Sequence, residues 1–179
     1  MKHSIWMTAT LATVFWVSAV QAQGLEQDVP GRAIMIPNAD VQAKLREMIA
    51  AGVQDEAVRV VSVDGESNLG IYLIHLNPRE SDGPITLSTH NDVPEVYYVL
   101  QGEGIVYHGG TIENPVPRSF AVVGPGTSGI GRDYLSQRVG PGDLFIVMPD
   151  TPHQVNVGAE TEMVYLVVRI DPEMHLEIQ

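Results

Sequence analysis

The feature that most constrains the fold is a series of short β-branched and aromatic runs that begins after Ala57. Clusters of Gly, Pro, Asn and Asp separate these runs, which is the pattern of strands joined by turns. The density of short strands is typical of an antiparallel sandwich or barrel and not of alternating βαβ units. The expected strands are Val58–Val63, Leu69–Leu76, Ile85–His90, Glu95–Gln101, Gly104–Tyr107, Ser119–Val123, Leu144–Met148, His153–Val157 and Glu162–Ile170.

One segment before the strands has a helical period instead. Its apolar residues recur at i, i+4, i+7 and i+8, and they are Val41, Leu45, Met48 and Ile49. Asp40 stands at the position of an N-cap, and Gly52 stops the helix. We therefore expect one short helix packed over an end of the sheet, within an N-terminal extension over residues 23–56, followed by a β-barrel domain over residues 57–179.

The first residues, Met1–Ala22, have the layout of a secretory signal peptide. Lys2 and His3 precede an apolar run without acidic or basic residues, and Val20-Gln21-Ala22 offers small residues at the cleavage position. An uncleaved membrane anchor is the alternative, but the run is shorter than the ~20 residues needed to cross a bilayer. We expect cleavage near Gln23 and a periplasmic or secreted protein with no membrane attachment afterwards.

The charge and the absence of cysteine narrow the classes of function. The formal net charge is -12, and loss of Lys2 with the signal would make the chain still more acidic. Such a surface repels nucleic acid and anionic lipid, so neither is an expected partner. With no cysteine in the chain, disulfides and thiolate metal sites are excluded. Any metal must be held by histidine, carboxylate or water.

The segment from His108 to Pro141 interrupts the regular spacing of the strands. It contains most of the chain's glycine-proline clusters, among them Gly124-Pro125-Gly126 and Gly140-Pro141-Gly142. Connections of this length inside a compact domain are uncommon unless they are functional. The sequence predicts a loop over the mouth of the barrel, with a plain surface excursion as the alternative.

Polar residues open two of the expected strands, although such groups are costly to bury. Side chains alternate across a strand, so Ser88 and His90 share one face, and Glu95 and Tyr97 share a face of the next strand. The turn Asn91-Asp92-Val93-Pro94 resets the parity between the two strands, so both faces can point into one interior.

A second polar position lies far along the chain. The turn Pro149-Asp150-Thr151-Pro152 brings His153 to the start of another strand. Two imidazoles and one carboxylate that converge inside a barrel form a reasonable site for a divalent first-row metal. From the residues alone this convergence is a suggestion.

Two motifs in this region resemble those of the cupins, a family of conserved double-stranded β-barrels. The first family motif is H-x-H, three or four residues, E, six residues and G, and it is matched by His90, Glu95 and Gly102. The second is G, five residues, P-x-G, two residues and H, and it is matched by Gly142 and His153, with Asp150 in place of the glycine. The resemblance covers about Val58 to Ile170.

This resemblance implies an all-β fold, a cupin jelly-roll barrel with a short N-terminal helix. It carries the family's metal ligands over to His90, Glu95 and His153, for a divalent ion such as Fe, Mn, Ni or Zn. Two family positions differ: Ser88 replaces the first histidine and Met148 replaces the proline of the second motif. The site is therefore interpreted as a 2-His-1-carboxylate set with open positions. A barrel that has given up its metal is the alternative.

The leading hypothesis is an exported metal-dependent enzyme, of dioxygenase, isomerase or lyase type, that acts on a small molecule. Tyr97 shares the face of Glu95 and is the candidate for positioning substrate or exchanging a proton, with core packing as the alternative. The rival hypothesis is a non-catalytic periplasmic module that binds a sugar or an organic acid. We also expect a homodimer, because a second subunit usually covers an apolar sheet face in this family, and Leu69–Leu76 is the candidate contact.

Three further polar residues are weaker candidates for a place in the same interior. Asp92 could replace the missing ligand, but its position indicates a turn or capping role. His108, beside Gly109-Gly110, could reach the pocket or could be exposed at a strand end. His75 has apolar neighbours and is expected to be a hydrogen-bonded structural residue.

Overall fold

The computed structural model describes residues 31, 33–79 and 82–178, and residues 35–179 form one compact unit. The predicted signal peptide, Met1–Ala22, lies outside the described residues. Within the described part of the chain, no helix combines the length and the apolar character needed to span a membrane.

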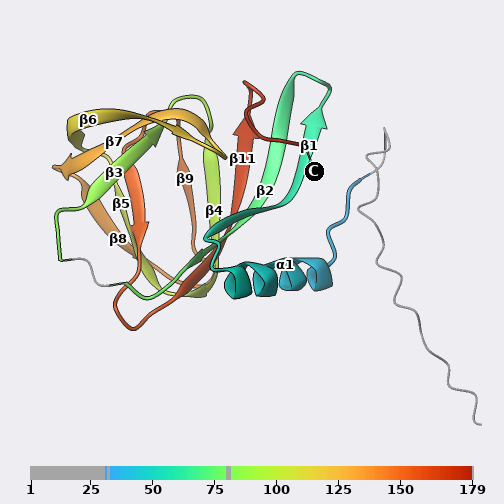
Figure 1. Ribbon diagram of the computed structural model, residues 1–179, viewed down its shortest axis with the longest axis horizontal. Coiled ribbons are helices and arrows are strands. Elements are labelled where there is room, and N and C mark those ends of the chain that lie inside the picture. Colours follow the sequence, from blue (N-terminus) through green and yellow to red (C-terminus); the bar gives the residue numbers. More distant parts are fainter. Residues whose placement is uncertain (1–30, 32, 80–81, 179) are drawn as a thin grey trace, which may run out of the picture. The chain divides into compact units, whose positions relative to one another are not determined.

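Two antiparallel sheets make up this unit, and they face each other across the core (Figure 1). One sheet has five strands in the order β1-β2-β11-β4-β9. Its strands are β1 (Asp55–Val63), β2 (Ser67–Leu76), β11 (Met163–Asp171), β4 (Glu95–Gly102) and β9 (Leu144–Val147). The second sheet has six strands in the order β6-β7-β3-β10-β5-β8. Its strands are β6 (Thr111–Phe120), β7 (Gly124–Arg132), β3 (Thr86–His90), β10 (His153–Asn156), β5 (Gly104–His108) and β8 (Leu135–Val139). The predicted all-β jelly roll is confirmed.

The prediction of a long loop from His108 to Pro141 is wrong, because this segment forms the three strands β6, β7 and β8. Strand β6 tolerates Pro115 and Pro117 because it is an edge strand, and its pairing with β7 shifts register between Glu113 and Val116. The expected strand Ser119–Val123 is also misplaced, since β6 ends at Phe120 and the next residues form a turn.

Glycine in β7 allows close contact between backbones, which is why a glycine-rich segment can still be a strand here. A Cβ atom on Gly126 would lie 1.9 Å from the carbonyl oxygen of Thr89 on β3. The glycines that made this segment look like a loop are therefore a requirement for the pairing of β7 with β3.

The main core lies between the two sheets. Alternate residues of β4 and β11 point into it, among them Tyr97, Val99, Tyr165 and Val167. Arg169 continues the same inward series on β11 and is also buried. The interior of the barrel is therefore apolar at one end and carries charged groups further along β11.

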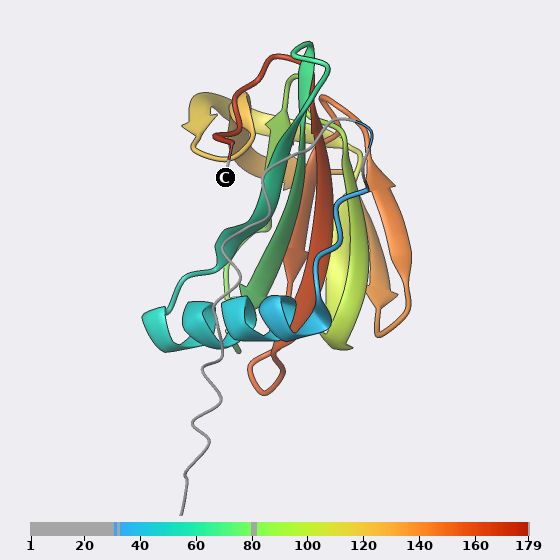
Figure 2. The same cartoon turned by 90° about the vertical axis from the view of Figure 1, so that its right-hand side faces the viewer.

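Helix α1 (Asn38–Ala51) packs on the five-stranded sheet away from this core, as Figure 2 shows. Leu45 and Met48 are buried against Leu73 and Val164 in a second, smaller cluster. The helix begins earlier than predicted: Pro37 occupies the N-cap position, so Asp40 lies in the first turn, where its charge is favourable. Gly52 ends the helix as predicted, in the left-handed conformation with φ of 67°.

The outer face of the five-stranded sheet remains partly uncovered. Leu144, Ile146 and Met148, on and just after the edge strand β9, are each more than half exposed, and Tyr98 on the paired strand β4 is 43% exposed. Strand β2, the predicted dimer contact, is paired on both sides by β1 and β11. The homodimer stays a prediction.

Candidate metal centre

Three strands bring the predicted ligands to one place inside the barrel. His90 ends β3, Glu95 begins β4 and His153 begins β10. Strand β10 pairs with β3 through His153 and Ser88, which sets the two histidine strands side by side in one sheet. Glu95 comes from the opposite sheet, where it pairs with Arg169 of β11. The site therefore joins the two sheets.

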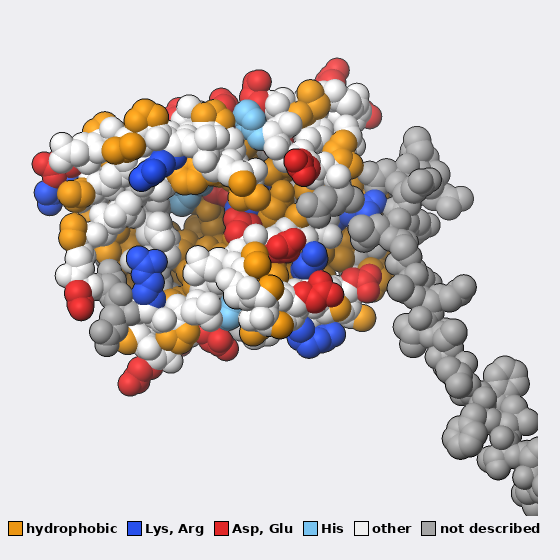
Figure 3. Space-filling model, in the orientation of Figure 1, with side chains coloured by type: hydrophobic (Ala, Val, Ile, Leu, Met, Phe, Trp, Pro, Cys, Tyr) orange, Lys and Arg blue, Asp and Glu red, His pale blue; other side chains and the backbone are white. Residues whose placement is uncertain are grey.

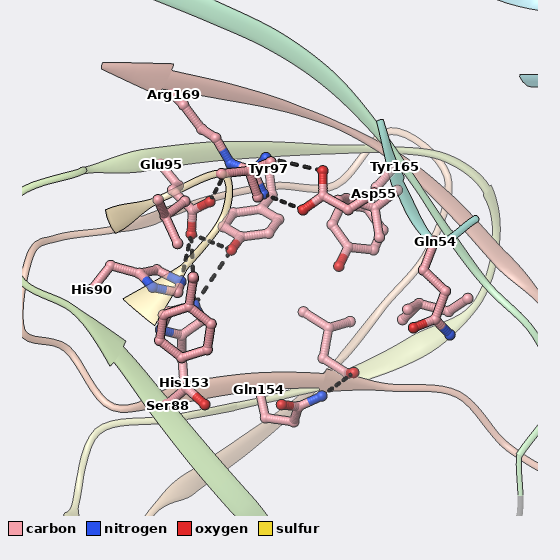
Figure 4. A pocket seen from close by; sticks show the side chains of 16 residues that line it. Gln54, Asp55, Ser88, His90, Glu95, Tyr97, His153, Gln154, Tyr165 and Arg169 are labelled. Carbon is pink, nitrogen blue, oxygen red and sulfur yellow. Dashed lines mark hydrogen bonds and ion pairs between the residues drawn. The ribbon is translucent and has the colours of Figure 1, made fainter. Parts of the chain in front are cut away.

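The three side chains point toward one another (Figure 4). Oε2 of Glu95 lies 3.5 Å from Nε2 of His90 and 3.6 Å from Nε2 of His153. One ligand atom from each of the three residues falls within 4.8 Å of the others. Glu95 is fully buried and His153 is 6% exposed. The sequence prediction named this group, and the fold brings all three members together.

The hydrogen bonds of His153 fit a metal ligand. Its Nδ1 lies 2.9 Å from the carbonyl oxygen of Thr151, which can only accept, so Nδ1 carries the proton. The unprotonated Nε2 then directs its lone pair toward Glu95, as in metal-ligating histidines held by a backbone carbonyl. His90 Nδ1 is buried without a partner in the structure, and the ring packs edge-on against Phe120 at 5.1 Å. Two imidazoles and a carboxylate are donors suited to a divalent first-row ion.

Tyr97 lies against the same carboxylate. Its hydroxyl donates to Oε2 of Glu95 at 2.6 Å and is 3.4 Å from Nε2 of His153. The ring is stacked on Phe145 with centroids 4.4 Å apart, so the hydroxyl is held in position. Burial and the Glu95 charge raise the pKa of Tyr97 well above its usual range. Tyr97 therefore keeps its proton and acts as a donor.

Arg169 is the functional residue that the sequence analysis missed. Its Nε donates to Oε1 of Glu95 at 2.8 Å, and its two terminal nitrogens donate to the carboxylate of Asp55 at 2.9 and 2.7 Å. The guanidinium also lies over the ring of Tyr72, 4.2 Å from its centroid. The sequence does contain a signal for it: Arg169 stands alone between Val168 and Ile170 in an apolar strand. A charged residue in such a strand indicates a buried polar site, as His90 and Glu95 do.

The buried charges shift the acidities of the ligands. Burial lowers the pKa of His90 to about 4, against the opposing effect of the Glu95 charge, so the imidazole is neutral at neutral pH. Burial alone would raise the pKa of Glu95, but contact with His153 and the charge of Arg169 lower it to about 2. A neutral imidazole beside an ionised carboxylate is the protonation state that metal binding requires.

The other candidate residues have different positions. Ser88 lines the same cavity as the three candidate ligands. Asp92 lies in the turn, with Oδ2 3.9 Å from Nε2 of His175. His108 lines a separate hollow beside β9, and the buried His75 contacts Glu162 at 3.3 Å, which agrees with its predicted structural role.

The cluster opens into a cavity of about 360 Å³ between the sheets. Figure 3 shows the described domain hollowed there, with hydrophobic side chains along the opening. Beyond the cluster the cavity is lined by aliphatic and aromatic groups and by a few polar groups. These are Gln54, Asp55, Ile74, Leu76, Ser88, Phe120, Val122, Val123, Gln154, Val155, Tyr165 and Arg169. A volume of this size admits a small molecule.

A double-sheet jelly roll with two histidines and one carboxylate in its interior defines a class of small β-barrel proteins. The chain belongs to the cupin family, whose model matches residues 39–176. The family resemblance seen in the two motifs is thereby confirmed. A search of the curated proteins gave no match.

Several solved structures are similar to this chain at low identity. A cupin protein from Bacteroides fragilis is 18% identical, with a TM-score of 0.35 and 62% of this chain and 71% of that chain covered. A predicted oxalate decarboxylase from Thermotoga maritima is 19% identical, with a TM-score of 0.41 and coverages of 65% and 80%. A protein from Bacillus halodurans is 16% identical, with a TM-score of 0.47 and coverages of 84% and 91%. These similarities do not extend to a particular activity.

Proposed function

We propose that this chain is an exported, metal-dependent cupin enzyme that acts on a small molecule by dioxygenase, isomerase or lyase chemistry. The observation that carries the proposal is the approach of both histidine Nε2 atoms to the same oxygen of Glu95, beside an open cavity. A divalent first-row ion would be held by His90, Glu95 and His153. When bound, it supplies Lewis acidity or electron transfer.

The protein's own residues set up the rest of the site. Arg169 occupies Oε1 of Glu95, so Oε2 is the oxygen that faces the two histidines. Tyr97 holds one proton on its hydroxyl at the edge of the cluster, and by exchanging its bond to Glu95 it could donate that hydrogen bond to a substrate oxygen. The cavity walls exclude bulk water from one side of the substrate.

Export is part of this proposal and is supported by the signal-like composition of Met1–Ala22.

The experiment that tests the metal site is metal analysis of the purified protein, together with titration of Co²⁺ or Mn²⁺ into metal-free protein by calorimetry. We expect one ion per chain, and His90→Ala, Glu95→Gln or His153→Ala should each abolish high-affinity binding. His108→Ala is the matched control, because this histidine lines a different hollow, and it should bind the ion normally. Retention of full metal content by His90→Ala would refute the site.

A metal-free binding module is the second candidate, and one observation favours it. Both oxygens of Glu95 already have partners in the protein, since Arg169 donates to one and Tyr97 to the other. The carboxylate is therefore stable without an ion. A protein that binds no divalent ion but is stabilised against heat by a sugar or an organic acid would establish this alternative.

A further inference from the structure

The charges of the cavity define the class of ligand that it accepts. We propose that the cavity takes a molecule with one metal-binding oxygen group and an uncharged remainder, and that it rejects a second anionic group held away from the ion. Monocarboxylates, hydroxyketones and the monoamides of dicarboxylates meet this description, whereas extended dicarboxylates do not. The inference rests on the proposed metal site and adds the substrate class to it.

The positively charged side chain in the cavity wall, Arg169, is not available to a ligand. Among the described residues that line the cavity, Arg169 is the one lysine or arginine. Arg169 is 4% exposed, and its guanidinium binds Asp55 through two nitrogens and Glu95 through the third. Two carboxylates therefore share one guanidinium, and the wall keeps one net negative charge.

A divalent ion would change the net charge of the cavity wall from minus one to plus one. Two positive charges added to the wall leave one net positive charge, which a single carboxylate or enolate oxygen group on the ligand neutralises. A further anionic group would then lie in a partly enclosed cavity without a counter-charge, and burying an unpaired charge is strongly unfavourable. The ion itself cannot serve both groups when the ligand holds them apart.

The remaining polar groups suit a neutral partner. Gln54 and Tyr165 lie on the side of the cavity opposite the histidines, and Gln154 lies between them (Figure 4). Amide and phenol groups donate and accept hydrogen bonds without charge, and burial raises the pKa of Tyr165, which stays neutral. Leu76 and Val122 add apolar surface to the cavity wall. The wall thus matches hydroxyl, amide or carbonyl groups on a short carbon skeleton.

Arg79 lies beside the cavity and could offer a positive charge to a ligand there. Arg79 is exposed and lines a neighbouring hollow of about 70 Å³, which shares Gln54, Leu76 and Gln154 with the main cavity. Because it does not line the main cavity, it can meet only a group that extends to the rim. The proposal therefore concerns the part of the ligand that is enclosed beside the histidines.

The test compares fumarate with its monoamide, fumaramate, on Co²⁺-loaded protein by calorimetric titration. The two compounds have the same shape, and the trans carboxylates of fumarate cannot bind the same ion. We expect fumaramate to bind at least about tenfold more tightly, because the second carboxylate of fumarate is left unpaired. Gln54→Lys should reduce this preference by adding a cation at the cavity. Gln137→Lys, which adds the same charge beside the separate hollow, should leave it unchanged.

The outcomes separate this inference from the metal site on which it rests. Co²⁺ binding is measured first, and its absence would refute the proposed metal site and the ligand class with it. Normal Co²⁺ binding with fumarate bound as tightly as fumaramate, or with neither compound bound, would overturn the ligand class alone. Tight fumarate binding that is lost in Arg79→Gln would also overturn it, because the rim arginine would then supply the counter-charge.

Discussion

Replacement of Arg169 by methionine tests whether this arginine holds Glu95, a proposed metal ligand, in place. The substitution removes three hydrogen bonds from the guanidinium to two carboxylates, along with its contact with the ring of Tyr72. Asp55 keeps partial access to water, with 29% of its side chain exposed, but Glu95 is fully buried. The main consequence is therefore an uncompensated negative charge at Glu95.

The expected size of the effect follows from these contacts. Hydrogen bonds to charged groups contribute about 1.5–3 kcal/mol each, and three of them would exceed the usual cost of breaking a buried ion pair. Release of the guanidinium from its own burial offsets part of this sum, so we expect a loss of about 3–5 kcal/mol in the free energy of unfolding. Arg132→Met is the matched control, because Arg132 pairs with Glu113 on the surface, where a loss of about 0–1 kcal/mol is expected.

The assay is equilibrium urea unfolding of metal-free protein, followed by far-UV circular dichroism. The double variant Arg169→Met/Glu95→Gln removes the orphaned charge and should recover part of the stability. A loss below about 1 kcal/mol for Arg169→Met, equal to that of the control, would refute the reasoning. A double variant less stable than Arg169→Met alone would show that the Glu95 charge is not the source of the loss.

Four further results are expected. The exported protein should lack Met1–Ala22 by intact mass and show tyrosine-type emission, because both tryptophans lie in that segment; a mass that includes it contradicts the export proposal. Light scattering should give a homodimer that Ile146→Glu weakens, and a wild-type monomer at micromolar concentration would count against the dimer. The pKa of His90 is lower in the folded protein than the unfolded value of 6.5, so metal-free protein should lose up to about 3 kcal/mol as the pH falls from 6.5 to about 4. Urea titrations of wild type and His90→Gln at both pH values check this, and an equal loss in both proteins would contradict it. Ser88→His should tighten Co²⁺ binding and weaken ligand binding by filling an open position, and calorimetry that gives unchanged Co²⁺ affinity would remove Ser88 from the site.

The strands that the sequence predicts well are those with continuous β-branched and aromatic content. Strand β4 was expected at Glu95–Gln101 and runs from Glu95 to Gly102. The strands β6, β7 and β8 were missed because their glycines and prolines are typical of loops in isolation. In the fold, the backbone of β3 lies so close to Gly126 that no side chain fits there, and β6 can contain Pro115 because it is an edge strand. Neither condition can be recognised from the local sequence.

The ligand set could be proposed from the sequence, but the contacts that hold it could not. His90, Glu95 and His153 are placed at strand ends by turns, and they fall in the spacing of two family motifs. The ion pairs behind Glu95 join distant parts of the chain: Arg169 lies 74 residues from Glu95 in sequence, and Asp55 reaches that arginine from 114 residues away. Only the pairing of β4 with β11 brings Arg169 opposite Glu95.

The sequence by itself determined the class of fold and the residues of the candidate metal site, because strand period, turn residues and motif spacing are properties of the sequence itself. The tertiary structure decided which charges meet. It placed a guanidinium between two carboxylates and so left the cavity without a free cation in its described wall. Long-range strand register fixes such contacts, since a shift of one residue would turn Arg169 to the opposite face of the sheet.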